Sequence, residues 1–370
     1  METTQTSESI TQNLEKPSPK FIEEFKEYIF NLQDEIVAGL QEHEEKKFVK
    51  NPWEKDLEHN KGNGSACIVE NGTTYEKAGV NVSQLTIKIT PGIYKTMSDQ
   101  NHMRTISADS LDNYQMFACG LSLVIHPLNP FVPTVHANYR VLIIIHKETS
   151  EIEDWWFGGG CDLTPIYLNV SDAIHFHKVL KEACDKHDET YYQKYKDICD
   201  KYFYIPYRKE SRGIGGIFFE NLNDKPFREI FEFAKECGNS FVESYCPIVA
   251  RRKNTPYTED HEDFRKWRRS RYAEFNLVFD RGTKFGLHTP NANIENILMS
   301  LPMSCSWKYN YKPKNKEEEK ILDVLQNPKD WVNHPTNVLS KSFSRSRSTI
   351  LSYPLVQFSK EEENPDKDSS

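Results

Sequence analysis

The segment 134–140, with the sequence Thr-Val-His-Ala-Asn-Tyr-Arg, constrains the fold of this chain more than any other. Successive side chains of a β-strand point to opposite faces. His136, Asn138 and Arg140 therefore fall on one face, and the intervening residues, including Tyr139, fall on the other. An antiparallel sheet can bury one face in a core and leave the other in contact with water. The alternation predicts a strand in a sheet with one polar face.

The polar face of this strand combines a titratable ring, an amide and a permanent cation. This set suits an anionic ligand that also exchanges a proton, because arginine pairs with carboxylates and histidine titrates near neutral pH. Taken alone, the same run also fits a surface strand with ordinary outward polar residues.

A second strand is predicted over 119–126, and a short proline-rich connection joins it to residue 134. So short a connection favours antiparallel pairing of the two strands. In many registers Ser122 and His126 then share the face of His136, whereas a shift of one residue would reverse this.

The whole pattern predicts an α+β fold with one large, mostly antiparallel sheet, because most strands are joined by loops too short for parallel crossovers. Strands are expected near 65–70, 76–83, 85–89, 119–126, 134–145, 154–157, 213–219 and 272–279. Helices are expected near 19–40, 172–187, 188–202, 225–250, 293–300 and 317–325. Residues 50–66 are expected to form a loop. A single domain is predicted over 19–358, between disordered tails at 1–18 and 359–370.

Composition narrows the class of protein. The net charge of −8 disfavours general nucleic-acid binding, and no apolar run is long enough to predict a membrane span. The eight cysteines are scattered without a C-x-x-C pair, which disfavours a zinc ribbon or a disulfide framework and fits reduced thiols. The first twenty residues hold three glutamates and no arginine, unlike a mitochondrial presequence. A cytoplasmic protein is expected.

Asp162 follows three consecutive glycines after the expected strand 154–157. The glycines let the backbone pass close to a ligand or to another chain segment. A phosphate loop is disfavoured, because no Lys-Ser/Thr pair follows at the required spacing. A turn or a helix cap is the alternative role for Asp162.

Several arginines flank expected strands, and two histidines lie close together in an expected helix. Arg212, Arg269 and Arg281 fit a receptor for a polycarboxylate, because arginine binds carboxylates in a bidentate manner. Solvated surface arginines or an address signal are the alternatives. His175 and His177 are two positions apart, so they do not share a helical face and cannot easily chelate one metal ion.

Eight blocks of the chain resemble the oxygen-dependent coproporphyrinogen-III oxidase family. They are EKAGVNVS (76–83), SLVIHPLNP (122–130), PTVHANYR (133–140), WWFGGGCDLTP (155–165), HFHKVLKEACDKH (175–187), RGIGGIFFENL (212–222), RSRYAEFNLVFDRGTKFGL (269–287) and NILMSLP (296–302). The blocks follow the family order over residues 65–335, and several are long and rare.

The resemblance implies oxidative decarboxylation of two propionates of coproporphyrinogen III, on rings A and B, to the vinyl groups of protoporphyrinogen IX in heme biosynthesis. O2 is then the co-substrate, CO2 and hydrogen peroxide are released, and no metal or organic cofactor is expected. The family fold is an antiparallel sheet of about seven strands with helices on both sides. A homodimer is implied as well, with its dimerisation segment at 272–308.

The resemblance also assigns roles by motif position. His136 matches the family's proposed proton donor, and Asp162 matches the acid thought to face the pyrrole nitrogens. Substrate-contacting positions are matched by Ser122, Asn138, Tyr139 and Arg140, and arginines implicated in activity by Arg212, Arg269 and Arg281. The family usually has Gly-Ser/Gly-Arg where this chain has Asn291, Ala292 and Asn293, so one carboxylate contact is missing or supplied elsewhere.

Some bacterial members of the family have a histidine set proposed to bind metal, and its positions here are His126, His136, His177 and Tyr207. The last is not a histidine, which disfavours a metal requirement. Two alternatives to the family's reaction remain open. One is a metal-dependent oxygenase in which His126, His136 and Asp162 bind the metal ion as a triad. A porphyrin-binding protein without catalysis, or a basic-patch interaction module, is the other.

Overall fold

The structure is a computed structural model that describes residues 17–57, 60–100, 102–103, 106–288 and 292–335. Contacts group residues 1–332 into one compact unit and 333–370 into a second. All helices and strands given below belong to the first unit. The predicted tails lie outside the described residues, except for Pro17 and Ser18, which precede the first helix. The predicted extent of the domain, 19–358, stays a prediction.

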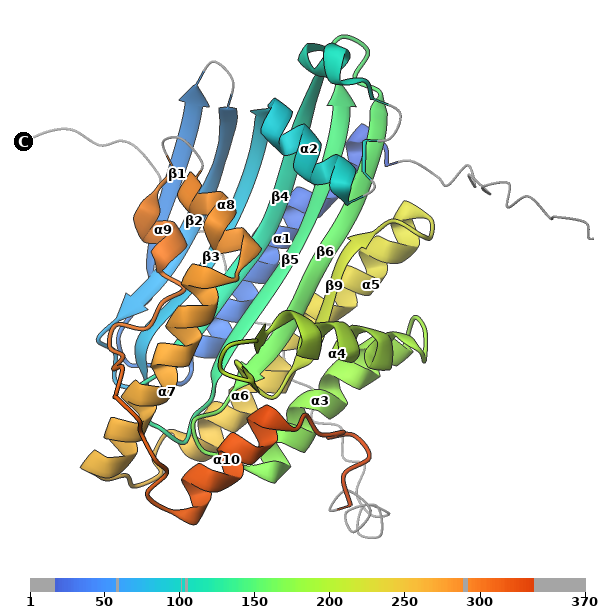
Figure 1. The fold of residues 1–370 in the computed structure, drawn as a ribbon. Helices are drawn as coiled ribbons and strands as arrows, with labels where there is room; N and C mark the ends of the chain where they lie inside the picture. The colour runs from blue at the N-terminus through green and yellow to red at the C-terminus, as the bar shows by residue number, and fades with distance from the viewer. Residues whose placement is uncertain (1–16, 58–59, 101, 104–105, 289–291, 336–370) are drawn as a thin grey trace, which may run out of the picture. The chain divides into compact units, whose positions relative to one another are not determined.

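Seven strands form one antiparallel sheet (Figure 1). In spatial order they are β1 (Val49–Leu57), β2 (Asn60–Glu70), β3 (Tyr75–Lys88), β4 (Tyr114–Pro127), β5 (Thr134–His146), β6 (Ile152–Thr164) and β9 (Gly216–Leu222). Every pairing between neighbours in this sheet is antiparallel. A separate hairpin consists of β7 (Tyr204–Ile205) and β8 (Glu210–Ser211). The predicted α+β class is therefore confirmed.

Helices cover both faces of the sheet (Figure 1). On one face lie α1 (Pro19–Gln41), α3 (Val170–Asp185), α5 (Phe227–Asn239) and α6 (Phe241–Arg252), with α4 (Tyr191–Tyr202) along β9. On the other lie α2 (Pro91–Asp99), α7 (Glu259–Val278), α8 (Arg281–His288) and α9 (Ile294–Leu298). The 3-10 helix η1 (Ala108–Asn113) precedes β4, and α10 (Lys316–Gln326) packs beside β8. None of the helices in the described ranges is long and apolar enough to cross a membrane.

The main core lies between the sheet and the helices of one face, α1, α3, α5 and α6. Proline fits the first turn of α1, where its missing N–H would have no partner within the helix. Phe25, Ile29 and Ile36 recur at helical spacing and are buried against the sheet. The odd-numbered side chains of β5 from 135 to 143 enter the same core. The even-numbered side chains, which include the predicted polar set, therefore face the opposite side.

The polar stretch 50–66 is predicted to be a loop but forms most of β1 and part of β2. β1 is an edge strand of the sheet, and many of its side chains are exposed, including that of Val49. Charged residues and proline, such as Pro52, are typical of edge strands. Backbone hydrogen bonds to β2 hold this strand in the sheet, and burial of one face does not. The sequence therefore lacks the hydrophobic alternation that would predict a strand.

The segment 272–279 is predicted to be a strand but belongs almost entirely to α7. Aromatic residues give it local β-propensity, which tertiary packing commonly overrides. Phe264, Trp267, Tyr272 and Phe275 are buried at helical spacing, and that stripe holds the segment in a helix. The strand prediction was wrong because it considered only the last part of a longer helical pattern.

Other element boundaries also differ from the predictions. The strand expected over 213–219 is β9, Gly216–Leu222. The expected helix over 225–250 is two helices, α5 and α6, which meet at Ser240. The expected strands at 76–83 and 85–89 are one strand, β3. The strand expected to end near Phe157 continues as β6 through the three glycines to Thr164, so Asp162 lies inside a strand and not beyond it.

Glu44 closes the turn between β2 and β3. Its carboxylate accepts hydrogen bonds from the backbone N–H groups of Lys46, Thr73, Thr74 and Tyr75 at 2.8–3.0 Å. Burial alone would raise the pKa of Glu44, but these hydrogen bonds favour the charged form and lower it to about 2.

We expect Glu44 to make the fold sensitive to acid. Because its folded pKa lies below the unfolded value of 4.5, its contribution is present above pH 4.5 and is lost as the pH falls towards 2. Glu44→Gln should lower the free energy of unfolding at pH 7 by about 1–3 kcal/mol and weaken its decline in acid. Urea unfolding at pH 7 and pH 3 measures both effects. The exposed neighbour Glu45, replaced by glutamine, is the control, and equal behaviour of the two variants would contradict the assignment.

Candidate active site

Three neighbouring strands build the polar face of the sheet. The β4–β5 register places Ser122 opposite Asn138 and Val124 opposite His136. The β5–β6 register places Asp162 opposite His136. Directly opposed residues of neighbouring strands share a face of the sheet. The predicted register, in which Ser122 joins the face of His136, is therefore confirmed.

Asp162 and His136 are hydrogen-bonded on this face. The distance from His136 Nδ1 to Asp162 Oδ1 is 2.8 Å, and the side chains of His136 and Asp162 are 20% and 2% exposed. An ionised carboxylate only accepts hydrogen bonds, so Nδ1 of His136 carries the proton. The imidazole thus lies between a buried charge and the open side of the sheet.

Arg212 holds the other side of Asp162. Its Nη2 lies 3.0 Å from Oδ1 and 2.9 Å from Oδ2 of the carboxylate, and its Nη1 donates to Oδ1 of Asn276 at 2.8 Å. The guanidinium is buried among aromatic rings, with centroids of Phe203 at 4.1 Å and Tyr272 at 4.4 Å. Cation–π contacts and the ion pair together compensate for removing this charge from water.

The environment keeps Asp162 ionised. Burial alone would raise the pKa of its carboxyl group. The positive charge of Arg212 and the hydrogen bond from His136 outweigh burial, so the pKa of Asp162 lies below its usual value. Burial lowers the pKa of Arg212, and the charge of Asp162 raises it. The net result is a raised pKa. The site therefore holds a carboxylate that is ionised near neutral pH, paired with Arg212 and buried under a partly exposed histidine.

A second group of charges lies farther along the same face. Arg140 donates from Nη2 to Oε1 of Glu220 at 2.8 Å and from Nη1 to Asn138. Arg281 pairs with the other oxygen of Glu220. Arg140 is four residues from His136 along β5, which corresponds to about 13 Å. Arg140 thus lies on the same face of the sheet as His136 but at a distance from it, and Arg281 meets Arg140 through Glu220.

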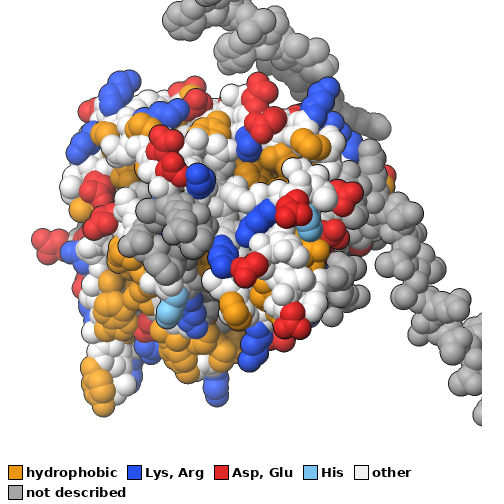
Figure 2. All heavy atoms as spheres, turned by 90° about the horizontal axis from the view of Figure 1, so that it is seen from above, with side chains coloured by type: hydrophobic (Ala, Val, Ile, Leu, Met, Phe, Trp, Pro, Cys, Tyr) orange, Lys and Arg blue, Asp and Glu red, His pale blue; other side chains and the backbone are white. Residues whose placement is uncertain are grey.

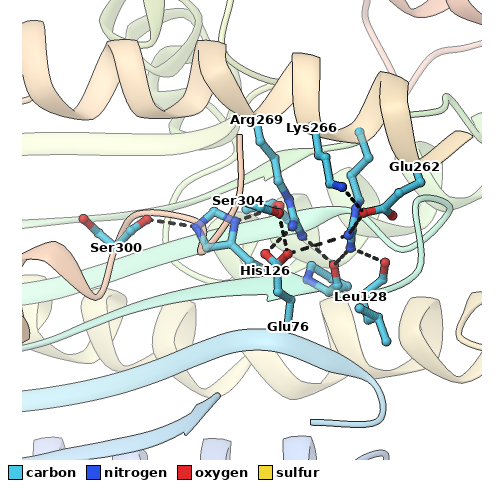
Figure 3. Close-up of polar contacts among 11 residues, drawn as sticks. Glu76, His126, Leu128, Glu262, Lys266, Arg269, Ser300 and Ser304 are labelled. Carbon is cyan, nitrogen blue, oxygen red and sulfur yellow. Dashed lines mark hydrogen bonds and ion pairs between the residues drawn. The ribbon is translucent and has the colours of Figure 1, made fainter. Parts of the chain in front are cut away.

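Arg269 is not brought to this surface. It is buried in α7 and pairs with Glu76 and with the carbonyl of Pro127, while Ser304 Oγ donates to Glu76 at 2.8 Å (Figure 3). Burial and the nearby Arg265 lower the pKa of Arg269 to about 10, against the opposing charge of Glu76. These contacts fasten α7 to β3 and β4, so in this arrangement Arg269 supports the fold around the site.

His126 lies beside this cluster and is fully buried (Figure 3). Its Nε2 is 2.9 Å from the carbonyl oxygen of Ser300, and its Nδ1 is 3.3 Å from Thr134 Oγ1. Burial, followed by the charge of Arg269, lowers its pKa well below the usual value, so the ring is neutral. Both ring nitrogens thus have partners other than His136 and Asp162.

The triad of His126, His136 and Asp162 considered above is therefore not assembled. No group of three or more histidine, cysteine, aspartate or glutamate side chains within the described ranges is arranged to hold a metal ion. His177 is also buried, and bonds Tyr192 and the Ile214 carbonyl. Burial lowers its pKa to about 3.

Tyr139 does not lie on the polar face, and the 291–293 stretch is only partly within the described residues. Tyr139 points into the core on the other face of the sheet, where its hydroxyl donates to the Cys237 carbonyl at 3.0 Å. Asn291 lies outside the described residues. Ala292 is half-buried, and Asn293 caps α9 by accepting from the N–H of Asn296. The expectation of an altered carboxylate contact at 291–293 stays a prediction.

Two residues of the site were missed by the sequence analysis. Asn276 was placed in an expected strand, whereas in a helix it lies one turn after Tyr272 and beside Arg212. Glu220 follows Phe218 with period two on β9, so the alternation of this strand could have placed it on the face of Asp162.

The fold and the site define a class of protein before any comparison. A wide antiparallel sheet with a buried carboxylate–arginine pair, a partly exposed histidine and two outer arginines is suited to an enzyme for an anionic small molecule. A family model described as coproporphyrinogen III oxidase matches residues 24–331. The chain belongs to this family.

Curated relatives agree with this assignment. A protein of Francisella tularensis subsp. tularensis (strain FSC 198), named oxygen-dependent coproporphyrinogen-III oxidase, is 45% identical over 317 residues, which cover 84% of this chain and 98% of the relative. A Drosophila melanogaster protein of the same name is 45% identical over 308 residues, covering 82% of this chain and 76% of the relative.

Proposed function

We propose that this chain catalyses the oxygen-dependent conversion of coproporphyrinogen III to protoporphyrinogen IX in heme biosynthesis. In each of two steps a propionate and O2 give a vinyl group, CO2 and H2O2, so the carbon chain loses two electrons and two hydrogens to oxygen as the carboxyl carbon leaves. The observation that carries the proposal is the buried, ionised Asp162 under His136 in a chain of this family.

Asp162 supplies the electronic requirement of this reaction. O2 reacts slowly with closed-shell organic molecules unless they are rich in electrons. A carboxylate that accepts hydrogen bonds from the pyrrole N–H groups raises the electron density of the macrocycle. Asp162 is 2% exposed and its Oδ1 is bonded to His136, so the pyrrole N–H groups reach the carboxylate as the imidazole moves aside. Arg212, itself held by Asn276, keeps the carboxylate charged and in place before substrate binds.

His136 and the outer arginines complete the proposed site. The imidazole, which is 20% exposed, is positioned to transfer protons as peroxide forms and leaves. Arg140 and Arg281 suit the propionate carboxylates of a tetracarboxylate substrate. Such pairing explains why a chain of net charge −8 carries arginines on this face. Ser122 and Asn138 line the surface between the two groups.

We propose that the reaction uses O2 as co-substrate without a metal or organic cofactor. The fourth position of the histidine set of some bacterial members is Tyr207, and His126 is committed to Ser300 and Thr134. Full activity after exhaustive chelation supports this proposal, whereas loss of activity and its recovery with added metal would contradict it.

We also propose that the chain forms a homodimer and resides in the cytoplasm. Figure 2 shows hydrophobic side chains gathered over the region of α8 and α9. The large exposed apolar residues of the segment from α7 onwards are Leu277, Val278, Phe285, Leu287, Ile294, Met303, Trp307 and Tyr309. An apolar patch of this kind is typical of a protein interface. Sedimentation of the intact chain measures the assembly.

The proposed cytoplasmic location rests on the cysteines. All eight are free thiols, as is usual in a reducing compartment.

We expect conversion of coproporphyrinogen III by the purified chain in air and not under anaerobic conditions. Porphyrinogens remaining at the end of each incubation are oxidised to porphyrins and identified by fluorescence after separation. Protoporphyrin should appear only in the aerobic sample. Binding of coproporphyrin without any conversion in air would instead support the non-catalytic porphyrin-binding protein.

A further inference from the structure

Glu220 is a carboxylate of the protein itself that occupies both outer arginines. Its Oε1 lies 2.8 Å from Arg140 Nη2, and its Oε2 pairs with Arg281 Nη2. The Glu220, Arg140 and Arg281 side chains are 22%, 31% and 51% exposed. One carboxylate thus lies between two guanidinium groups at the open side of the site, where a substrate carboxylate would also bind.

Glu220 does not hold β9 in the sheet. The β9 strand is fixed by its ladder with β6 and by Phe218 and Phe219, which are buried in two hydrophobic clusters. Partly exposed ion pairs contribute little to stability. The position of Glu220 between two arginines is therefore better explained by ligand binding than by folding.

The two arginines are held differently. The guanidinium of Arg140 also donates to Asn138 and lies over Gly158, where an added Cβ would be 3.0 Å from its Cζ atom. The guanidinium of Arg281 rests on the ring of Tyr202, 4.8 Å from the centroid, and pairs with Glu220. Arg281 is also the more exposed of the two. Its pairing is thus the one that an incoming carboxylate can replace at least cost.

We propose that Glu220 occupies Arg281 in the free protein and gives it up to a carboxylate of the substrate. In this exchange the ion pair between Arg281 and Glu220 is replaced by an ion pair between Arg281 and a substrate carboxylate. The guanidinium of Arg281 therefore has a carboxylate partner both before and after binding. Glu220 then competes with the substrate and limits its affinity. This inference rests on the proposed function, because it takes the ligand to be a polycarboxylate.

Glu220→Gln tests the exchange, because it keeps the size of the side chain and removes its charge. The probe is coproporphyrin III, the oxidised tetracarboxylate, which binds without turnover and is followed by its fluorescence. We expect Glu220→Gln to bind the probe about threefold to tenfold more tightly at low ionic strength. The difference should shrink in high salt, because ions screen partly exposed charges. With coproporphyrinogen III, KM should fall by a similar factor while kcat changes less than twofold.

Three further variants separate this effect from general ones. Glu24→Gln removes a carboxylate paired with Arg228, at 2.7 and 3.0 Å, on the opposite side of the sheet. It makes the same change in net charge and should leave affinity unchanged. Glu220→Asp restores the charge and should return affinity towards that of the wild type. In an Arg281→Ala background, Glu220→Gln should no longer tighten binding.

Unchanged or weaker binding by Glu220→Gln would overturn the proposal, and weaker binding would indicate a supporting role for the glutamate. Tightening that persists without Arg281 would also contradict the exchange. The binding measurements need no turnover, so they are independent of the catalytic proposal. A chain that shows the expected affinities but no aerobic conversion would contradict the proposed reaction and leave the exchange standing.

Discussion

Asp162→Asn is expected to reduce kcat for coproporphyrinogen III by at least about a hundredfold and to destabilise the fold by about 3–5 kcal/mol. The loss of activity follows because a neutral amide cannot take the role proposed for the carboxylate at the pyrrole N–H groups. The loss of stability follows because Arg212 is 2% exposed and would be left without its counter-charge. Steady-state kinetics and urea unfolding measure the two effects separately.

A double variant separates the electronic role of Asp162 from its structural role. Asp162→Asn combined with Arg212→Met removes both buried charges, so no buried arginine is left without its counter-charge as in Asp162→Asn alone. The double variant should regain most of the stability lost in Asp162→Asn and none of the activity. Recovery of turnover together with stability would show that Asp162 only supports the fold, and would contradict the mechanism.

Arg212→Met alone is expected to make activity depend strongly on pH. Without the guanidinium, burial dominates and the pKa of Asp162 moves above its usual value, although His136 still opposes that change. The ratio kcat/KM should then rise with increasing pH as the carboxyl group ionises, whereas in the wild type Asp162 is already charged. A pH profile of both proteins measures the difference.

The contribution of Asp162 to the free energy of unfolding should change with pH in opposite directions in Arg212→Met and in the wild type. A carboxyl group whose folded pKa exceeds its unfolded value of 3.8 binds more protons in the folded state, so the free energy of unfolding falls as the pH rises above about 3.8. Arg228→Met, which removes an arginine of an exposed ion pair, is the matched control and should change neither profile. A pH profile like that of the wild type in Arg212→Met would refute the electrostatic coupling.

The part of the site on β4 and β5 could be predicted from the sequence. The polar face containing His136, Asn138 and Arg140 follows from period two alone. A short proline-rich connection suffices to pair this strand with β4 in an antiparallel manner. The family resemblance added Asp162 and Arg212, and the structure brings both to His136.

The rest of the site depended on partners distant in sequence. Arg269 and Arg212 look alike in the sequence, yet Arg269 meets Glu76 in a buried cluster and Arg212 meets Asp162. Glu220 was missed because its role arises only when β9 lies beside β6 and α8 begins close by. Local propensity favoured a strand for Tyr272 and its neighbours, whereas burial of a helical stripe decided for α7.

The sequence by itself determined the strand alternation, the amphipathic first helix and the antiparallel order of the central strands, because these depend on spacing between near neighbours. Only the tertiary structure decided which arginine binds which carboxylate, and which charges are buried or accessible. The reason is that the energy of a buried charge depends on desolvation and on the position of its counter-charge, and both are fixed only when distant segments pack together.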